Sequence, residues 1–215
     1  DSLHRLGYQV PAIAASKAEA IQQAEQSQPD LIIMDIVLDS EIDGIEAAEI
    51  IRNRFDIPIV YLSAYDDEAL IQRASSTEPF GYLLKPFSNQ ELYATIEIAL
   101  HKHAAEKALR YRLKFEHLLS EISTMFMQVS GSQLDVHIID GLRKISTFLG
   151  ADRSFVFLIS EDQRSVRNTH EWCAEGIVSQ RDDFQRVPID DFSRFAEQLQ
   201  RLEIVSVQHT SDLPP

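Results

Sequence analysis

The sequence predicts an α/β protein whose first hundred residues form a parallel sheet, followed by a long helix and a smaller α+β domain with an antiparallel sheet. Three apolar runs, at residues 31–34, 58–62 and 81–84, alternate with segments of helical periodicity. Runs as apolar as these suit strands that are buried on both faces. Their alternation with helices implies right-handed crossovers, and therefore parallel strands.

Capping boxes mark the start of two helices in this part of the chain. Ser16 and Ser88 each lie three residues before a glutamate, which is the spacing of that motif. Residues 8–14 are predicted to form a further strand, and residues 67–74 a short helix. One more helix is predicted from the helical spacing of Ile45, Ala48, Ile51 and Phe55.

The helix after Ser88 is predicted to run far beyond the first domain, because residues 101–128 contain neither Gly nor Pro. Its first apolar face holds Leu92, Ile96 and Ala99. A second stripe, out of phase with the first, has the heptad spacing of a coiled coil. Two interpretations stay open: pairing with a second copy through residues 104–129, or an amphipathic helix that packs on its own domain. The second stripe consists of Ala104, Ala108, Tyr111, Phe115, Leu118, Ile122, Met125 and Val129.

Residues 130–132 break this helix and open the last part of the chain. A new helix, with Ile138, Leu142, Ile145 and Leu149 on one face, is predicted to stop at Gly150. Residues 154–159 and 165–172 are predicted to pair as an antiparallel hairpin. The last predicted elements are a strand at residues 204–207 and, before it, a helix capped by Asp190 or Asp191 with Phe192, Phe195, Leu199 and Leu202 inward.

Composition narrows the function classes. The 215 residues are 44% hydrophobic, which suffices for one large or two small cores. A formal net charge of −14 argues against a general nucleic-acid or anionic-membrane binder. Cys173 is the only cysteine, which excludes an internal disulfide and favours the reducing cytoplasm. No apolar run approaches the length of a membrane span, and the N-terminus shows no signal-peptide pattern.

Each of the three apolar runs ends on a chemically capable residue: Asp35, Ser63 and Lys85. In an open α/β sheet, ligands bind outside the carboxyl ends of the strands. We therefore expect these three side chains to converge. A carboxylate, a hydroxyl and an ammonium group together suit the capture of a phosphoryl group.

The sequence around these strand ends resembles the receiver domain of two-component response regulators. The similar stretches are Ile33-Met34-Asp35 with Asp43-Gly44 downstream, Leu62-Ser63-Ala64, and residues 81–87, which read Gly-Tyr-Leu-Leu-Lys-Pro-Phe. Single motifs often mislead, whereas three in the family's order on successive strands are specific. The resemblance covers residues 1–100 and implies a flavodoxin-like fold.

The resemblance also implies a role for each matching residue. Asp35 would be the phosphoacceptor and would attack the phosphorus of a phosphohistidine. Ser63, Ala64 and Lys85 would bind the phosphoryl oxygens, with the lysine supplying positive charge. Tyr82 would be an aromatic switch residue, although packing in the core explains a strand tyrosine equally well.

The implied cofactor is Mg²⁺, with Asp35 and the backbone carbonyl of Val37 as candidate ligands. The Lys85–Pro86 peptide bond would be cis, as is typical of the family. One departure stands out, because receivers carry an acidic pair on a first strand that this sequence lacks. We therefore expect a fragment of a longer protein, and we expect this fragment alone neither to bind Mg²⁺ tightly nor to take up phosphate.

The last part of the chain, residues 131–215, resembles the first portion of a GAF sensor domain. The similar stretches are residues 149–157, 168–173 and 211–214. Members of that family bind varied ligands, so the ligand of this domain stays unknown. Cys173 could attach a chromophore, but a lone strand cysteine is more often an apolar filler.

The sequence thus predicts a cytoplasmic signalling protein: a receiver over residues 1–100, a signalling helix over 101–130 and an incomplete GAF domain over 131–215. Its expected partner is a phosphohistidine donor, either a histidine kinase or a phosphotransfer domain, and it is expected to pair as a homodimer. No nucleic-acid partner is expected. Two function classes stay open: a parent enzyme, such as a histidine kinase or diguanylate cyclase, or a non-catalytic adaptor or phosphate sink.

Overall fold

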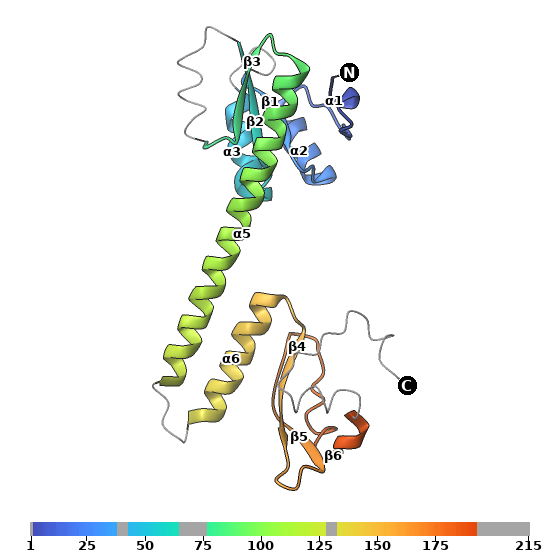
Figure 1. Cartoon of the computed structure of the whole chain (residues 1–215), viewed down its shortest axis with the longest axis vertical. Coiled ribbons are helices and arrows are strands. Elements are labelled where there is room, and N and C mark those ends of the chain that lie inside the picture. Colours follow the sequence, from blue (N-terminus) through green and yellow to red (C-terminus); the bar gives the residue numbers. More distant parts are fainter. Residues whose placement is uncertain (1, 38–42, 65–76, 128–132, 193–215) are drawn as a thin grey trace. The chain divides into compact units, whose positions relative to one another are not determined.

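The computed structural model describes residues 2–37, 43–64, 77–127 and 133–192 and divides into two compact units, Asp1–Arg112 and Leu113–Pro215 (Figure 1). No helix in these four ranges combines the length and apolarity that crossing a membrane requires. The elements in chain order are α1 (Ser2–Arg5), α2 (Lys17–Ser27), β1 (Ile32–Asp35), α3 (Asp43–Phe55), β2 (Ile59–Ala64), β3 (Gly81–Lys85), α5 (Asn89–Met127), α6 (Leu134–Leu149), β4 (Arg153–Ile159), β5 (Ser165–Cys173), β6 (Val187–Pro188) and the 3₁₀ helix η2 (Ile189–Phe192).

A parallel three-stranded sheet in the order β1-β2-β3 forms the centre of the first unit. Ile32 lies opposite Ile59, and Val60 lies opposite Gly81. The strands predicted at 31–34, 58–62 and 81–84 are therefore confirmed, as is their parallel direction. Because the strands point the same way, their carboxyl ends meet at one edge of the sheet.

Each face of this sheet is covered by its own apolar cluster. Side chains alternate between the faces along a strand, so neighbours such as Val60 and Tyr61 enter different clusters. One cluster joins the sheet to α2 and α3 through Ala24, Met34, Ile45, Ala48, Ile51, Ile59 and Tyr61. The other joins it to α1 and α5 through Leu3, Leu6, Val60, Leu83, Leu92, Ile96 and Ala99.

The capping box at Ser88 forms in both directions, whereas at Ser16 the glutamate side chain accepts from the N–H of Ala15 and not from that of the serine. The Ser16 side chain accepts a bond of 3.4 Å from the backbone N–H of Glu19 at the start of α2. At the start of α5, the backbone N–H of Ser88 donates to Glu91 Oε2 at 2.7 Å, and the N–H of Glu91 donates to Ser88 Oγ at 3.2 Å. Each bond satisfies a backbone donor that a helix start otherwise leaves unpaired.

The strand predicted at residues 8–14 is wrong. These residues are described, and they pair with no strand. A strand is stable only where its ladder has a partner, and the described sheet offers none beside this segment. Pro11 also removes one backbone donor, and Ile13 is strongly exposed. The segment instead contributes Tyr8 to the cluster beneath α5.

Helix α5 is continuous over 39 residues, as the absence of Gly and Pro predicts. In the second unit, the later part of its heptad stripe packs against α6 of the same chain. Leu118 is buried, and the Phe115 and Phe148 rings lie 5.9 Å apart. A Cβ added to Gly141 would lie 3.5 Å from Met125 Cε. The interpretation as a helix that packs on its own domain therefore holds for this part of the stripe, and pairing with a second copy stays a prediction.

The second unit contains α6 and an antiparallel sheet in the order β4-β5-β6. Gly150 ends α6 in the left-handed region at φ 67°, and the Ser146 hydroxyl donates to Ser154 Oγ at 2.6 Å, which ties the helix to β4. The predicted helix and hairpin are confirmed, whereas β6 is an addition. Predictions that fall on residues 67–74, 193–207, 211–214 and Val129 lie outside the described residues.

Candidate phosphoryl-acceptor site

Asp35 and Lys85 meet at the carboxyl edge of the parallel sheet. Asp35 ends β1 and Lys85 ends β3, with β2 between them. Leu62 lies opposite Asp35 and Ala64 lies opposite Lys85, so β3 carries its lysine two residues further along the sheet than β1 carries its aspartate. The Lys85 ammonium forms an ion pair with Asp35 Oδ2 across β2. The expected convergence of this carboxylate and this ammonium group is seen directly.

The Asp35–Lys85 pair is open to solvent. The Asp35 side chain is 37% exposed and the Lys85 side chain is 44% exposed. The other carboxylate oxygen, Oδ1, accepts a bond of 3.3 Å from the backbone N–H of Val37. An incoming group can therefore reach a carboxylate whose orientation is fixed by one cation and one backbone donor.

Ser63 lies at the same edge, one residue before the end of β2 and opposite Leu84. It is only 3% exposed, so its hydroxyl is held inside the strand end and not on the open surface. Ala64 completes the strand. The structure thus brings all three predicted strand ends to one edge and places Asp35 and Lys85 in direct contact.

Gly44 is a further residue of the site. The sequence shows it only as part of the Asp43-Gly44 motif and does not indicate that it lies against Asp35. It lies in the first turn of α3. A Cβ at this position would collide with the backbone carbonyl oxygen of Asp35 and come within 2.9 Å of that of Ile36. Only glycine allows this close approach of helix and strand.

Tyr82 is half-buried on β3. Its ring lies 5.9 Å from that of Tyr61, which is fully buried and shares a hydrogen bond of 2.9 Å with the Thr77 hydroxyl. Tyr82 therefore packs on the cluster beneath α2 and α3. The Lys85–Pro86 bond at the end of the same strand is cis.

Residues 1–97 match the family described as the response regulator receiver domain. They are a receiver domain. The receiver resemblance expected from the strand-end motifs is thereby confirmed for this part of the chain.

Two curated relatives and two solved structures resemble the receiver domain. The transcriptional regulatory protein PdtaR of Mycobacterium tuberculosis H37Rv is 37% identical over 109 residues, which is 51% of this chain and 53% of PdtaR. The transcriptional regulatory protein YdfI of Bacillus subtilis 168 is 31% identical over 93 residues, 43% of each chain. The chain thus spans about half the length of the curated relatives it matches.

The first solved structure is the signal receiver domain of a modulated diguanylate cyclase from Desulfovibrio desulfuricans G20. It is 35% identical, with a TM-score of 0.46, and the match covers 49% of this chain and 83% of that one. The second is the N-terminal domain of a response regulator/sensory box/GGDEF three-domain protein from Carboxydothermus hydrogenoformans. It is 32% identical, with a TM-score of 0.45 and coverage of 49% and 84%.

Receiver domains typically bind Mg²⁺ for phosphorylation, but the described residues do not complete such a site. In the four described ranges, no three His, Cys, Asp or Glu side chains lie together so as to hold a metal ion. Asp35 supplies one carboxylate, and Lys85 engages one of its oxygens. Mg²⁺ prefers a near-octahedral set of oxygen ligands. Asp35 and the carbonyl of Val37 alone fall short of that set.

Cys173, the possible attachment point for a chromophore, lies on β5 of the second unit, three residues after His170. His170 Nε2 lies 3.1 Å from Asp135 Oδ1 at the start of α6, and its Nδ1 lies 2.9 Å from Thr169 Oγ1. Cys173 is a half-buried free thiol opposite Arg153. His170 thus takes part in the contact between α6 and the sheet, and Cys173 in the pairing of β4 with β5.

Proposed function

We propose that the receiver domain accepts a phosphoryl group on Asp35 from a phosphohistidine in a two-component relay. The observation that supports this most directly is the Asp35 carboxylate, exposed at a strand end and paired with the Lys85 ammonium. A carboxylate is a competent nucleophile when it is oriented and open to its reaction partner. The donor would be a histidine kinase or a phosphotransfer domain.

In the proposed step, an oxygen of Asp35 forms a bond to phosphorus while the phosphorus–nitrogen bond of the donor imidazole breaks. The electron pair of that bond stays on the imidazole nitrogen. Negative charge is spread over the three equatorial oxygens of the transferred group. Lys85 lies where its ammonium can move from the carboxylate to one of these oxygens.

Ser63 and Ala64 would contact the phosphoryl oxygens from the end of β2, through the hydroxyl and the backbone. Tyr82 would respond to that contact. Tyr82 packs against Tyr61, and Tyr61 is hydrogen-bonded to Thr77. A displacement of Tyr82 would therefore be transmitted to these two residues in the core. These roles follow from the family resemblance and from the positions of the residues.

We further propose that α5 carries the change onward. The helix runs without a break from Asn89 to Met127, from the receiver into the second unit. The second unit would be a GAF sensor, as its helix followed by an antiparallel sheet suggests. Pairing of two copies would use the stripe over residues 104–129.

A phosphorylation assay with matched variants tests the acceptor. The protein, with any residues that its gene encodes before Asp1, is incubated with a phosphorylated donor, then reduced with borohydride and digested. We expect homoserine at position 35 by mass spectrometry. Asp35→Asn should abolish the signal, while Asp30→Asn, an exposed acid ahead of the same strand, should retain it. Signal that persists in Asp35→Asn would rule out the proposed acceptor.

A further inference from the structure

The face of α5 that docks on the receiver extends well past the apolar residues that begin it. Leu92, Ile96 and Ala99 are buried against the sheet. The same spacing of four and three residues continues as His103, Glu106 and Arg110. Residues spaced in this way share one helix face. The docking face therefore becomes polar and continues 13 residues beyond residue 97, where the family match ends.

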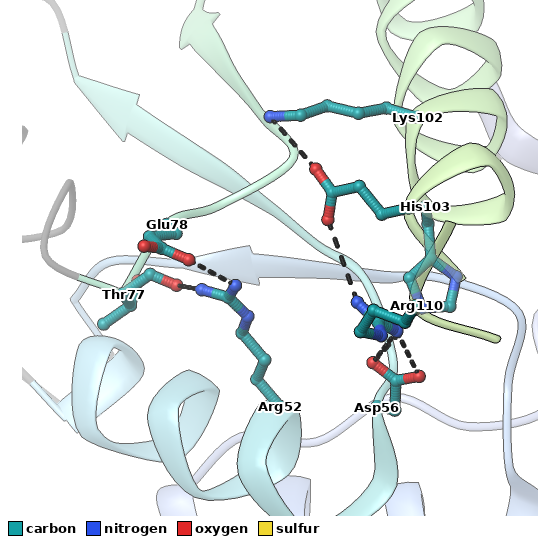
Figure 2. A network of polar contacts seen from close by, with 8 residues as sticks. Arg52, Asp56, Thr77, Glu78, Lys102, His103 and Arg110 are labelled. Atoms are coloured by element: carbon teal, nitrogen blue, oxygen red, sulfur yellow. Dashed lines mark hydrogen bonds and ion pairs between the residues drawn. The ribbon is translucent and has the colours of Figure 1, made fainter. Parts of the chain in front are cut away.

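Asp56, an acid on the receiver, faces this polar continuation. Both oxygens of Asp56 accept hydrogen bonds from Arg110 Nη2, at 2.8 and 2.7 Å, and Oδ1 lies 3.5 Å from His103 Nε2 (Figure 2). The His103 nitrogen is buried and makes no hydrogen bond. Its ring meets the Phe80 ring edge-on at 5.3 Å. Asp56 and Phe80 thus contact the turn of α5 that carries His103. Asp56 also binds Arg110, two turns further along the helix.

Asp56 occupies a position that does not favour an aspartate. It follows the last residue of α3 and has a left-handed backbone, with φ 54°. Glycine suits that conformation best, and a negative charge at a helix C-terminus opposes the helix dipole. Both effects act against this residue, whereas its carboxylate is stabilised by the contact with Arg110.

Arg110 is itself oriented along α5. Glu106 lies 4.0 Å from Arg110 and 3.9 Å from Lys102. The three side chains form a row of alternating charges on the helix surface. Lys102 Nζ also lies 5.4 Å from the centre of the Phe80 ring. The row presents the guanidinium to Asp56, two turns after His103.

The docked face and the heptad stripe lie on different sides of α5. Ala104, Ala108 and Tyr111 are exposed, Tyr111 to 56%, whereas His103 and Glu106 on the docked face are half-buried. Fixing the docked face therefore fixes the direction in which the stripe points. A rotation of the helix would have to break the contacts of Asp56.

We propose that Asp56 is a positioning residue, a charge clamp that fixes the rotation of α5 through Arg110 and His103. Its role in signalling rests on the proposed relay through α5. The clamp residues are partly exposed, and ion pairs in such positions are individually weak. A modest change within the receiver can therefore detach the polar half of the docked face of α5 from the receiver. The apolar half stays bound to the sheet.

Hydrogen exchange of the full chain, without any phosphoryl donor, tests the clamp. Asp56→Asn keeps the size of the side chain and tolerates the left-handed backbone, but removes the charge. We expect amides 101–112 to exchange about 1.5-fold to fivefold faster, with amides 89–97 and the sheet unchanged. Arg110→Gln should have the same effect, and the double variant should add little, because both changes remove one interaction.

Glu46→Gln is the matched control, since it removes a surface acid that pairs with Lys17 between α2 and α3, away from α5. Unchanged exchange at 101–112 in Asp56→Asn would overturn the clamp. So would faster exchange throughout the receiver, or an equal effect of Glu46→Gln. A negative result for phosphorylation of Asp35 leaves this outcome unaffected, so the two proposals fail separately.

Discussion

Gly44 lies so close beneath Asp35 that no side chain fits between them. A Cβ on residue 44 would overlap the backbone carbonyl oxygen of Asp35 and approach that of Ile36 to 2.9 Å. Both obstacles are backbone atoms, which cannot rotate away as the tip of a side chain can. The strand end that carries the candidate nucleophile therefore rests on the first turn of α3, and its position depends on a glycine there.

Gly44→Ala should lower the stability of the receiver by about 1–3 kcal/mol, the usual range for overpacking a site with no free space. It should also displace Asp35 relative to Lys85. Urea unfolding followed by circular dichroism measures the first effect, and the NMR signals of Asp35 and Val37 report the second. An unfolding midpoint equal to that of the unmodified chain would show that the two segments can separate freely.

Gly141→Ala should have the opposite sign. Its Cβ would make ordinary contacts in α6, 3.5 Å from Met125 Cε and 3.7 Å from Phe126 Cε2. Replacing a glycine inside a helix by alanine stabilises by about 0.5–1 kcal/mol where there is space. The expected result is a higher unfolding midpoint for the second unit. A lower midpoint would mean that α5 and α6 pack more tightly than these distances indicate.

Lys85→Met should slow phosphoryl transfer to Asp35 by about 10²–10³-fold, because one charge that stabilises the transition state is lost. Stability should change by less than about 1 kcal/mol, since both side chains of the Asp35–Lys85 pair are partly exposed to water. The initial rate in the borohydride assay gives the first number. Lys17→Met, which breaks the surface pair with Glu46, is the control and should transfer at the original rate.

Local chemistry made much of this fold predictable. The parallel strands follow from apolar runs that need burial on both faces, and the helix starts follow from serines that satisfy orphan N–H groups. Asp35 and Lys85 could be paired in advance because the carboxyl ends of parallel strands share an edge. These inferences depend on residues that are close in sequence, or on the common direction of the strands in any parallel sheet.

Tertiary partners set the limit of that approach. Residues 8–14 have strand-like composition, but no described strand lies beside them to complete a ladder. The heptad stripe of α5 predicts that another helix packs against it, but it does not identify that helix. In the structure, α6 of the same chain covers the later part of the stripe. Asp56 and Arg110 are 54 residues apart, so nothing in their local sequence indicates that they meet.

Tyr8 links the start of the chain to α5 in a way that depends on pH. Its hydroxyl donates to Glu97 Oε1 at 2.7 Å, and its ring lies 6.4 Å from that of Tyr93. Burial, the hydrogen bond to Glu97 and the charge of Glu97 together raise the pKa of Tyr8 to about 12. The unfolded chain releases this proton nearer the ordinary value of 10.0.

Because the folded chain holds the proton more tightly, the stabilising effect of Tyr8 is complete below pH 10.0 and is lost as the pH rises toward about 12. Tyr8→Phe removes that titration and should flatten the fall in stability across this window, while Tyr61, whose pKa is also raised by burial, remains in both chains. Urea unfolding at several pH values gives the difference between the two chains. A difference that stays constant with pH would mean that the Tyr8 hydroxyl ionises alike in the folded and unfolded chains.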